Sequence, residues 1–250
     1  MPVLEYRLTG TSHKAKGQPC QDACGYCITP DGFLLLCVAD GVSSSPHAEE
    51  GSRIAVDSLL AFWQEYALAF TDDQSLLCAL EASFNYAFGQ IMQRKGTEYG
   101  YETTLHAALL CNECSLYYGN AGDGGLFIRA GAEPARCLTE AMKDEDGASV
   151  VPLSAGPKMW QFGCFHSPEP LSVLLATDGL RDVLCSPAHG ADALAALTDP
   201  SLATRLDSSA KTDAFFKELF LGKTPGQNPA LKALQTITDD ITLEMYIPQK

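Results

Sequence analysis

Two short, largely apolar segments that each end in an Asp-Gly pair constrain the fold of this chain more than any other feature. The segment Phe33–Ala39 runs into Asp40-Gly41, and the segment Leu171–Thr177 runs into Asp178-Gly179. Segments of this length and composition favour buried strands over helices. A carboxylate packs poorly where a buried strand ends, but it is well placed there to hold a cation. We therefore expect the two Asp-Gly pairs to belong to one acidic site.

A predicted hairpin brings a third carboxylate to the same place. Pro30-Asp31-Gly32 is a turn signal between the strand-like segment Ala23–Thr29 and the strand that ends before Asp40, and this pattern predicts an antiparallel hairpin. One strand begins where the other ends, so Asp22 should lie beside Asp40. The polar segment Thr11–Gln21, which contains a glycine and a proline, predicts a loop leading into the hairpin.

The rest of the chain alternates between helical and strand-like patterns. Apolar residues at helical spacing predict helices from Pro46 to Phe70, capped at Ser45, and from Asp72 to Lys95, with a capping box of Thr71 and Gln74. Shorter helices are expected over 179–184, over 188–221 in two pieces broken near residue 199, and over 230–236. Further strands are expected at Val3–Thr9, Thr104–Cys111, Ser115–Asn120, Gly125–Ala130, Met159–Phe165 and Ile241–Ile247, with a meander turn at residues 121–124.

This order of elements limits the fold class. Regular β-α-β alternation is missing, which argues against a doubly wound parallel sheet. We predict an α+β fold in which helices pack outside two mainly antiparallel sheets. The chain has 250 residues, of which 46% are hydrophobic, so a substantial core is possible, and we expect a single domain over residues 1–250.

Charge and hydropathy exclude some classes of partner. The formal net charge is −14, and no basic cluster stands out, so we expect no nucleic-acid partner. No stretch of about 18 apolar residues exists, which argues against a membrane span. The segment MPVLEYRLTG lacks the basic and then apolar pattern of a signal peptide. We therefore expect a cytoplasmic protein without membrane contact.

The ten cysteines include two C-x-x-C pairs, Cys24 with Cys27 and Cys111 with Cys114, which together could form a structural zinc site. However, the segment from Cys111 to Cys114 is also typical of a hairpin turn, and Cys24 and Cys27 would face opposite sides of a strand. We favour reduced thiols that pack as small apolar groups and keep zinc as an alternative.

Four aspartates stand at strand ends: Asp22, Asp40, Asp178 and Asp239. Any single Asp-Gly pair can be a simple turn, but four carboxylates next to apolar strands favour a common site. Clustered carboxylates repel one another unless a cation compensates their charge. Hard oxygen ligands suit Mg²⁺ or Mn²⁺. Two such ions can hold a water, lower its pKa and clamp a phosphoryl oxygen.

Six short motifs follow one another in the chain: Gln21-Asp22-Ala23, Val38-Ala39-Asp40-Gly41, Thr103-Thr104-Leu105, Asn120-Ala121-Gly122-Asp123, Ala176-Thr177-Asp178-Gly179-Leu180 and Asp239-Asp240-Ile241-Thr242. In this order they resemble the metal-dependent protein serine/threonine phosphatases of the 2C type, in a bacterial branch, from Gly10 to Ile247. The resemblance implies a four-layer α-β-β-α sandwich, in which helix pairs flank two mainly antiparallel sheets. It also implies hydrolysis of phosphoserine or phosphothreonine on a protein substrate by a water bridging two metal ions, with a cognate kinase as a further partner.

The resemblance also assigns roles to the aspartates. Asp40 would bridge two Mn²⁺ or Mg²⁺ ions, and Asp178 and Asp239 would hold one of them. The carbonyl of Gly41 would help hold the other ion, and Asp22 would act nearby, directly or through water. Asp123 matches a family aspartate with a structural role.

Several positions depart from the family pattern. Gln21 replaces a glutamate, which removes one negative charge. The family's phosphate-gripping arginine is replaced by a stretch that offers His13, Lys14 and Lys16. His13 could bind phosphate or donate a proton, and His47 is a second general-acid candidate. An aspartate that some members use for a third metal appears as Tyr99, for which Glu98 or Glu102 could substitute.

These departures keep rival functions open. A pseudophosphatase that uses the fold as a binding or regulatory module would explain Gln21 and the missing arginine, whereas the four aspartates oppose it. An unrelated two-metal nuclease or phosphoesterase is a third hypothesis, against which the acidic composition counts. A zinc-binding structural protein is the fourth.

Overall fold

Ten strands form two five-stranded antiparallel sheets in the computed structural model, which describes residues 3–65, 72–94, 100–222 and 229–248. Sheet A contains, in spatial order, β1 (Val3–Leu8), β10 (Ile241–Tyr246), β9 (Leu171–Ala176), β6 (Gly125–Ala130) and β7 (Arg136–Cys137). Sheet B contains β2 (Asp22–Ile28), β3 (Leu34–Asp40), β4 (Leu105–Asn112), β5 (Ser115–Ala121) and β8 (Gln161–His166).

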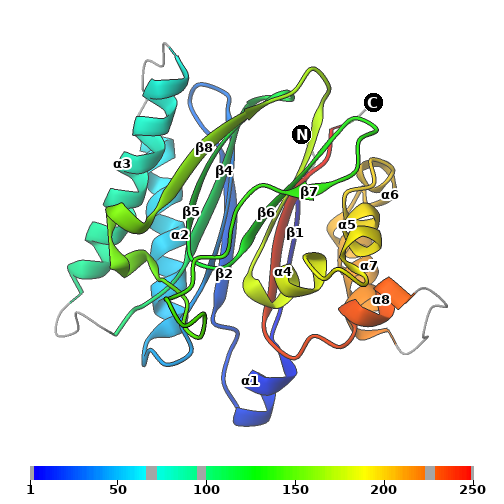
Figure 1. Ribbon diagram of the computed structural model, residues 1–250, viewed down its shortest axis with the longest axis horizontal. Coiled ribbons are helices and arrows are strands. Elements are labelled where there is room, and N and C mark those ends of the chain that lie inside the picture. The colour runs from blue at the N-terminus through cyan, green and yellow to red at the C-terminus, as the bar shows by residue number, and fades with distance from the viewer. Residues whose placement is uncertain (1–2, 66–71, 95–99, 223–228, 249–250) are drawn as a thin grey trace.

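Helices cover the outer faces of both sheets, as Figure 1 shows. The long helices α2 (Ala48–Glu65) and α3 (Asp73–Met92) lie on sheet B. Sheet A is covered by α4 (Asp178–Leu184), α5 (Gly190–Leu197), α6 (Leu202–Arg205), α7 (Ser209–Leu221) and α8 (Pro229–Leu234). These layers confirm the predicted α-β-β-α sandwich, whereas the single domain over residues 1–250 stays a prediction. None of the described helices has the length and apolar character needed to cross a membrane.

The alternation of side chains in β3 explains its continuous apolar sequence. Leu34, Leu36 and Val38 point into the core between the sheets. Leu35 and Cys37 point into the core under α2 and α3. A strand that is buried on both faces needs no polar alternation. The end of β3 is therefore fixed deep in the sandwich, and Asp40 is carried to its rim.

The predicted loop Thr11–Gln21 is wrong in its first half, because Thr11–Lys16 forms the short helix α1. The helix ends at Gly17, whose φ of 68° is left-handed, and the Gly17 N–H donates to the carbonyl of Lys14 at 3.1 Å. Five polar residues and one alanine show no apolar periodicity from which this helix could be predicted.

The predicted helix boundaries hold only in part. The cap at Ser45 is wrong, because α2 begins at Ala48 and Ser45 Oγ instead accepts the N–H of Glu102 at 3.1 Å. Helix α3 is capped by Asp72, whose carboxylate accepts the N–H of Ser75 at 2.8 Å. The predicted capping residue Thr71, like the predicted helix ends at Phe70 and Lys95, lies outside the described residues. Segment 188–221 forms three helices instead of two.

The turn at residues 121–124 does not continue a meander, as the sequence predicted. It carries the chain out of sheet B at the end of β5 and into sheet A at the start of β6. Gly122 has a φ of 127°, and a Cβ there would lie 2.5 Å from the side chain of Thr104. The crossing therefore requires glycine.

The two C-x-x-C pairs do not form a four-thiol zinc site. Cys24 packs in the core between the sheets and Cys27 in the core under α2, as their parity predicted. The residues from Cys111 to Cys114 lie at the β4–β5 hairpin. Within the described residues, no cluster brings these four thiols together.

Candidate metal centre

The β2–β3 hairpin places Asp22 directly opposite Asp40, as the sequence predicted. Asp22 is almost completely buried, and its carboxyl group interacts with that of Asp40. The hydroxyl of Thr177 donates to Asp22 Oδ2 at 2.8 Å and accepts the N–H of Thr242 at 3.1 Å. Thr177 thus links a carboxylate of sheet B to the neighbouring strands β9 and β10 of sheet A.

Asp178 and Asp239 come from those two neighbouring strands of sheet A. Asp178 is the first residue of α4, just after β9, and Asp239 precedes β10. A Cβ on Gly179 would lie 3.3 Å from the Cβ of Asp239, so the first turn of α4 abuts that residue. The charges of Asp178 and Asp239 both act on Asp40. The structure therefore places the four predicted aspartates where the two sheets meet, near enough for their charges to interact.

The electrostatics of the cluster match the chemistry of a divalent-cation site. Burial raises the pKa of Asp22 to about 6 and that of Asp178 to about 7. Burial, and then the negative charges of Asp22 and Asp178, raise the pKa of Asp40 well above its usual range. The donors are all hard oxygens, which Mg²⁺ and Mn²⁺ prefer. These residues fit such ions, because a divalent cation would offset both the burial and the mutual repulsion that raise the pKa values.

Backbone contacts hold Asp40 and Gly41 in place. The Asp40 carbonyl accepts the N–H of Thr104 at 2.8 Å and the hydroxyl of Thr103 at 2.9 Å, and the Asp40 N–H donates to Thr104 Oγ1 at 2.8 Å. A Cβ on Gly41 would lie 2.3 Å from the carbonyl oxygen of Ala48. The start of α2 therefore approaches Gly41 so closely that only glycine fits.

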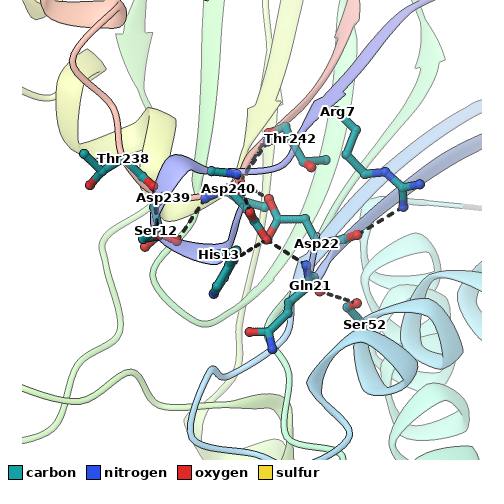
Figure 2. A network of polar contacts seen from close by, with 12 residues as sticks. Arg7, Ser12, His13, Gln21, Asp22, Ser52, Thr238, Asp239, Asp240 and Thr242 are labelled. Atoms are coloured by element: carbon teal, nitrogen blue, oxygen red, sulfur yellow. Dashed lines mark hydrogen bonds and ion pairs between the residues drawn. The ribbon is translucent and has the colours of Figure 1, made fainter. Parts of the chain in front are cut away.

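Asp240, for which the sequence predicts no role, organises the site. It is 3% exposed, and its carboxylate accepts the N–H groups of Gly10 and Gln21, each at 2.7 Å. Figure 2 shows that these contacts tie the start of α1 and the start of β2 to β10. The sequence feature that could have pointed to Asp240 is a second aspartate directly before an apolar strand. The neighbouring Asp239 is exposed, so the two carboxylates have opposite environments.

The two candidate histidines lie in different surroundings. His13 is buried on α1, and its Nδ1 lies 2.9 Å from Asp240 Oδ2, a distance typical of an ion pair, but without hydrogen-bond geometry. His47 is exposed, and its ring stacks on Tyr101 with the centroids 4.7 Å apart. In the described part of the chain, no hydrogen bond or ion pair joins the His47 ring to an aspartate. The structure thus connects His13, but not His47, to the acidic cluster.

Gln21, which departs from the family pattern, and Asp123, which matches it, lie next to the cluster. Gln21 is buried, and its Oε1 has no hydrogen-bond partner among the described residues. Asp123 is buried close enough for its charge to act on Asp178, and Lys143 Nζ lies 3.5 Å from its carboxylate. Glu98 and Tyr99, at the position of the third-metal aspartate, lie outside the described residues.

His106 supports the turn beside the cluster as a neutral side chain. Its Nδ1 pairs with Asn120 Oδ1, and its Nε2 accepts the N–H of Gly124 at 3.2 Å. Burial lowers the pKa of His106 to about 4. Below pH 6.5 the unfolded chain takes up a proton at this residue and the folded chain does not, so acid destabilises the fold.

We expect this histidine to remove about 3 kcal/mol from the free energy of unfolding as the pH falls from about 6.5 to about 4. The variant His106→Gln can donate to Asn120 and accept from Gly124 without titrating. Urea unfolding of both proteins across this pH range measures the difference in their pH dependence. Parallel curves would show that His106 ionises equally in the folded and the unfolded chain.

Comparisons with known proteins place this geometry in context. A sequence profile described as protein phosphatase 2C matches residues 9–231. No curated protein sequence matches the chain. The serine/threonine phosphatase of S. agalactiae superposes with a TM-score of 0.69 at 17% identity, over 99% of both chains. The Mycobacterium tuberculosis serine/threonine phosphatase PstP/Ppp gives a TM-score of 0.67 at 18% identity, over 100% of this chain and 99% of its own. The structure of RsbX in complex with magnesium gives 0.57 at 16% identity, over 97% and 92% of the two chains.

Proposed function

The chain belongs to the protein phosphatase 2C family, and from this premise we propose that it hydrolyses phosphoserine and phosphothreonine on proteins with the help of two Mn²⁺ or Mg²⁺ ions. The observation that carries the proposal is the cluster of Asp22, Asp40 and Asp178 at the junction of the sheets, whose pKa values are all raised. The acidic composition of the chain argues against a nuclease that uses the same metals. A cognate kinase and a cytoplasmic location stay predictions from the sequence.

Several residues of the chain would hold and orient these ions. Asp40 would hold both ions, Asp178 and Asp239 would hold one, and the Gly41 carbonyl would hold the other. Asp22, fixed by Thr177, would act nearby. When bound, such ions act as Lewis acids toward a phosphoryl oxygen and lower the pKa of an attacking water. Clamping of the Asp40 backbone by two threonines supports this arrangement, because a preorganised ligand loses little entropy on binding.

His13 is the proposed general acid for the departing serine or threonine oxygen. Its contact with Asp240 would hold the ring in one orientation beside the cluster. We expect His13→Gln to lower kcat for a phosphothreonine peptide by about a hundredfold. An aryl phosphate has a good leaving group and should lose much less. An equal loss for both substrates would indicate phosphate binding instead. His47→Gln is measured in parallel, and a loss there alone would transfer the role to His47.

A panel of phosphopeptides tests the proposed activity. Purified protein with Mn²⁺ or Mg²⁺ should release phosphate from phosphoserine and phosphothreonine peptides, and a chelator should abolish the release. Release that survives the chelator would contradict the metal-dependent mechanism.

The second candidate is the pseudophosphatase, which the neutral Gln21 beside the cluster favours. It predicts that the protein binds Mn²⁺, seen as a rise in Tm, but releases no phosphate from any peptide. The two hypotheses therefore differ in turnover and not in metal binding. A protein that is not stabilised by Mn²⁺ or Mg²⁺ would contradict both.

A further inference from the structure

Glu244 is a fully buried carboxyl group outside the aspartate cluster. It lies in β10 on the face that points between the sheets, next in that row to Tyr246, which belongs to the inter-sheet core. Its Oε2 accepts the N–H of Cys37 at 3.0 Å, whereas its Oε1 has no hydrogen-bond partner in the described structure. A buried carboxylate oxygen without a partner is costly, so this atom requires either a proton or a cation.

Two further side chains that can bind a metal ion lie beside the Glu244 carboxyl group. Glu5 in β1 is the direct cross-strand partner of Glu244, and Cys24 reaches the same space from β2 in the other sheet. The cysteine sulfur and one oxygen from each glutamate lie within 4.8 Å of one another. Like charges directly opposite each other on paired strands destabilise a sheet. The three groups thus form a small acidic cluster between the two sheets, at the edge that β1 and β2 form.

Arg7 carries the positive charge of β1, and it is already hydrogen-bonded to another residue. Arg7 is two residues beyond Glu5 on the same face, but its Nη1 donates to the carbonyl oxygen of Asp22 at 3.2 Å, as Figure 2 shows. Arg7 still acts on Cys24 electrostatically. One guanidinium cannot offset both glutamates, and it makes no hydrogen bond to the unpartnered oxygen.

We propose that Glu5, Cys24 and Glu244 form a Zn²⁺ site distinct from the proposed catalytic centre. Zn²⁺ takes thiolate and carboxylate ligands together, whereas Mg²⁺ and Mn²⁺ prefer oxygen alone. Three protein ligands leave one position for water. The ion displaces the thiol proton of Cys24 and the carboxyl proton of Glu244, and both protons leave to solvent. It would clamp β1 and β10 of sheet A to β2 of sheet B.

One of the three proposed ligands faces solvent. Glu5 is exposed and lines a pocket of about 590 Å³. The pocket lies between β1, Tyr26 of β2 and the residues around the start of α7. A metal ion can therefore reach the Glu5 side of the cluster directly from solvent.

Co²⁺ provides a spectroscopic readout that the all-oxygen catalytic centre would not give. Co²⁺ bound by a thiolate gives a sulfur-to-metal charge-transfer band in the near ultraviolet, and an all-oxygen site gives none. We expect metal-free wild-type protein to develop this band with one equivalent of Co²⁺ and to lose it when Zn²⁺ is added. The variant Cys24→Ser should lack the band. The control Cys164→Ser should keep it, although the Cys164 sulfur lies within 4.8 Å of ligand atoms of Asp73 and His166, which could also hold a metal ion.

A second variant keeps the test independent of folding. Glu5 is exposed, so Glu5→Gln should fold normally, and we expect its Zn²⁺ affinity to fall at least tenfold. A band that persists in Cys24→Ser, or an unchanged affinity in Glu5→Gln, would overturn the proposal. A wild-type protein without the band would also overturn it and would leave Glu244 as a protonated carboxyl group. None of these outcomes depends on phosphatase activity.

Discussion

Replacing Asp40 by asparagine should lower the Mn²⁺-dependent release of phosphate from a phosphothreonine peptide by about a thousandfold, equivalent to about 4 kcal/mol of barrier. The asparagine would keep the shape of the side chain and the backbone contacts with Thr103 and Thr104. Only the charge at the centre of the cluster would be lost. The expected loss is large because Asp40 is the residue proposed to hold both ions. Steady-state phosphate release at saturating Mn²⁺ measures the effect.

Stability provides the control for this variant. The pKa of Asp40 is raised in the folded protein, so its charge opposes folding at neutral pH. Metal-free Asp40→Asn should therefore be at least as stable as wild type, and Mn²⁺ should raise its Tm less. A variant that keeps more than about a tenth of the wild-type rate would contradict the role given to Asp40. A rate loss that accompanies a loss of stability would point to misfolding.

The positions of Asp22 and Asp40 could be predicted because they depend on local geometry. A short turn fixes the hairpin register, and register fixes which residues face each other. The continuous apolar sequence of β3 likewise indicates that both faces of this strand are buried. Which strands pair beyond a hairpin depends on distant contacts. The crossing of the chain between sheets at Gly122 was therefore missed, although the glycine itself is visible in the sequence.

Buried polar residues were the hardest to predict. In β10, Thr242 and Glu244 alternate with apolar residues, a pattern typical of a strand with one face in solvent. In the structure the second sheet covers that face, and Glu244 becomes fully buried. Asp240 and His13 are buried for a similar reason, because α1 folds over the end of β10. The sequence shows which residues alternate but not which layer covers them.

Asp239 and Asp240 are adjacent aspartates for which we expect opposite effects of the same substitution. Asp240→Ala leaves the buried N–H groups of Gly10 and Gln21 without their acceptor and removes the partner of His13. Each unsatisfied N–H costs about 1–3 kcal/mol, so the free energy of unfolding should fall by about 4 kcal/mol. Asp239 is exposed, and Asp239→Ala should change stability by less than about 1 kcal/mol while lowering kcat about a hundredfold.

Urea unfolding and phosphate release measured on both variants separate these roles. The comparison is matched, because the two variants lose the same atoms one residue apart. If Asp239→Ala unfolds as easily as Asp240→Ala, the exposed carboxylate supports the fold and its assignment as a metal ligand loses its basis. If Asp240→Ala is as stable as wild type, the contacts to Gly10 and Gln21 do not anchor α1. The proposed orientation of His13 would then also lose its basis, because the same Asp240 carboxylate contacts Gly10, Gln21 and His13.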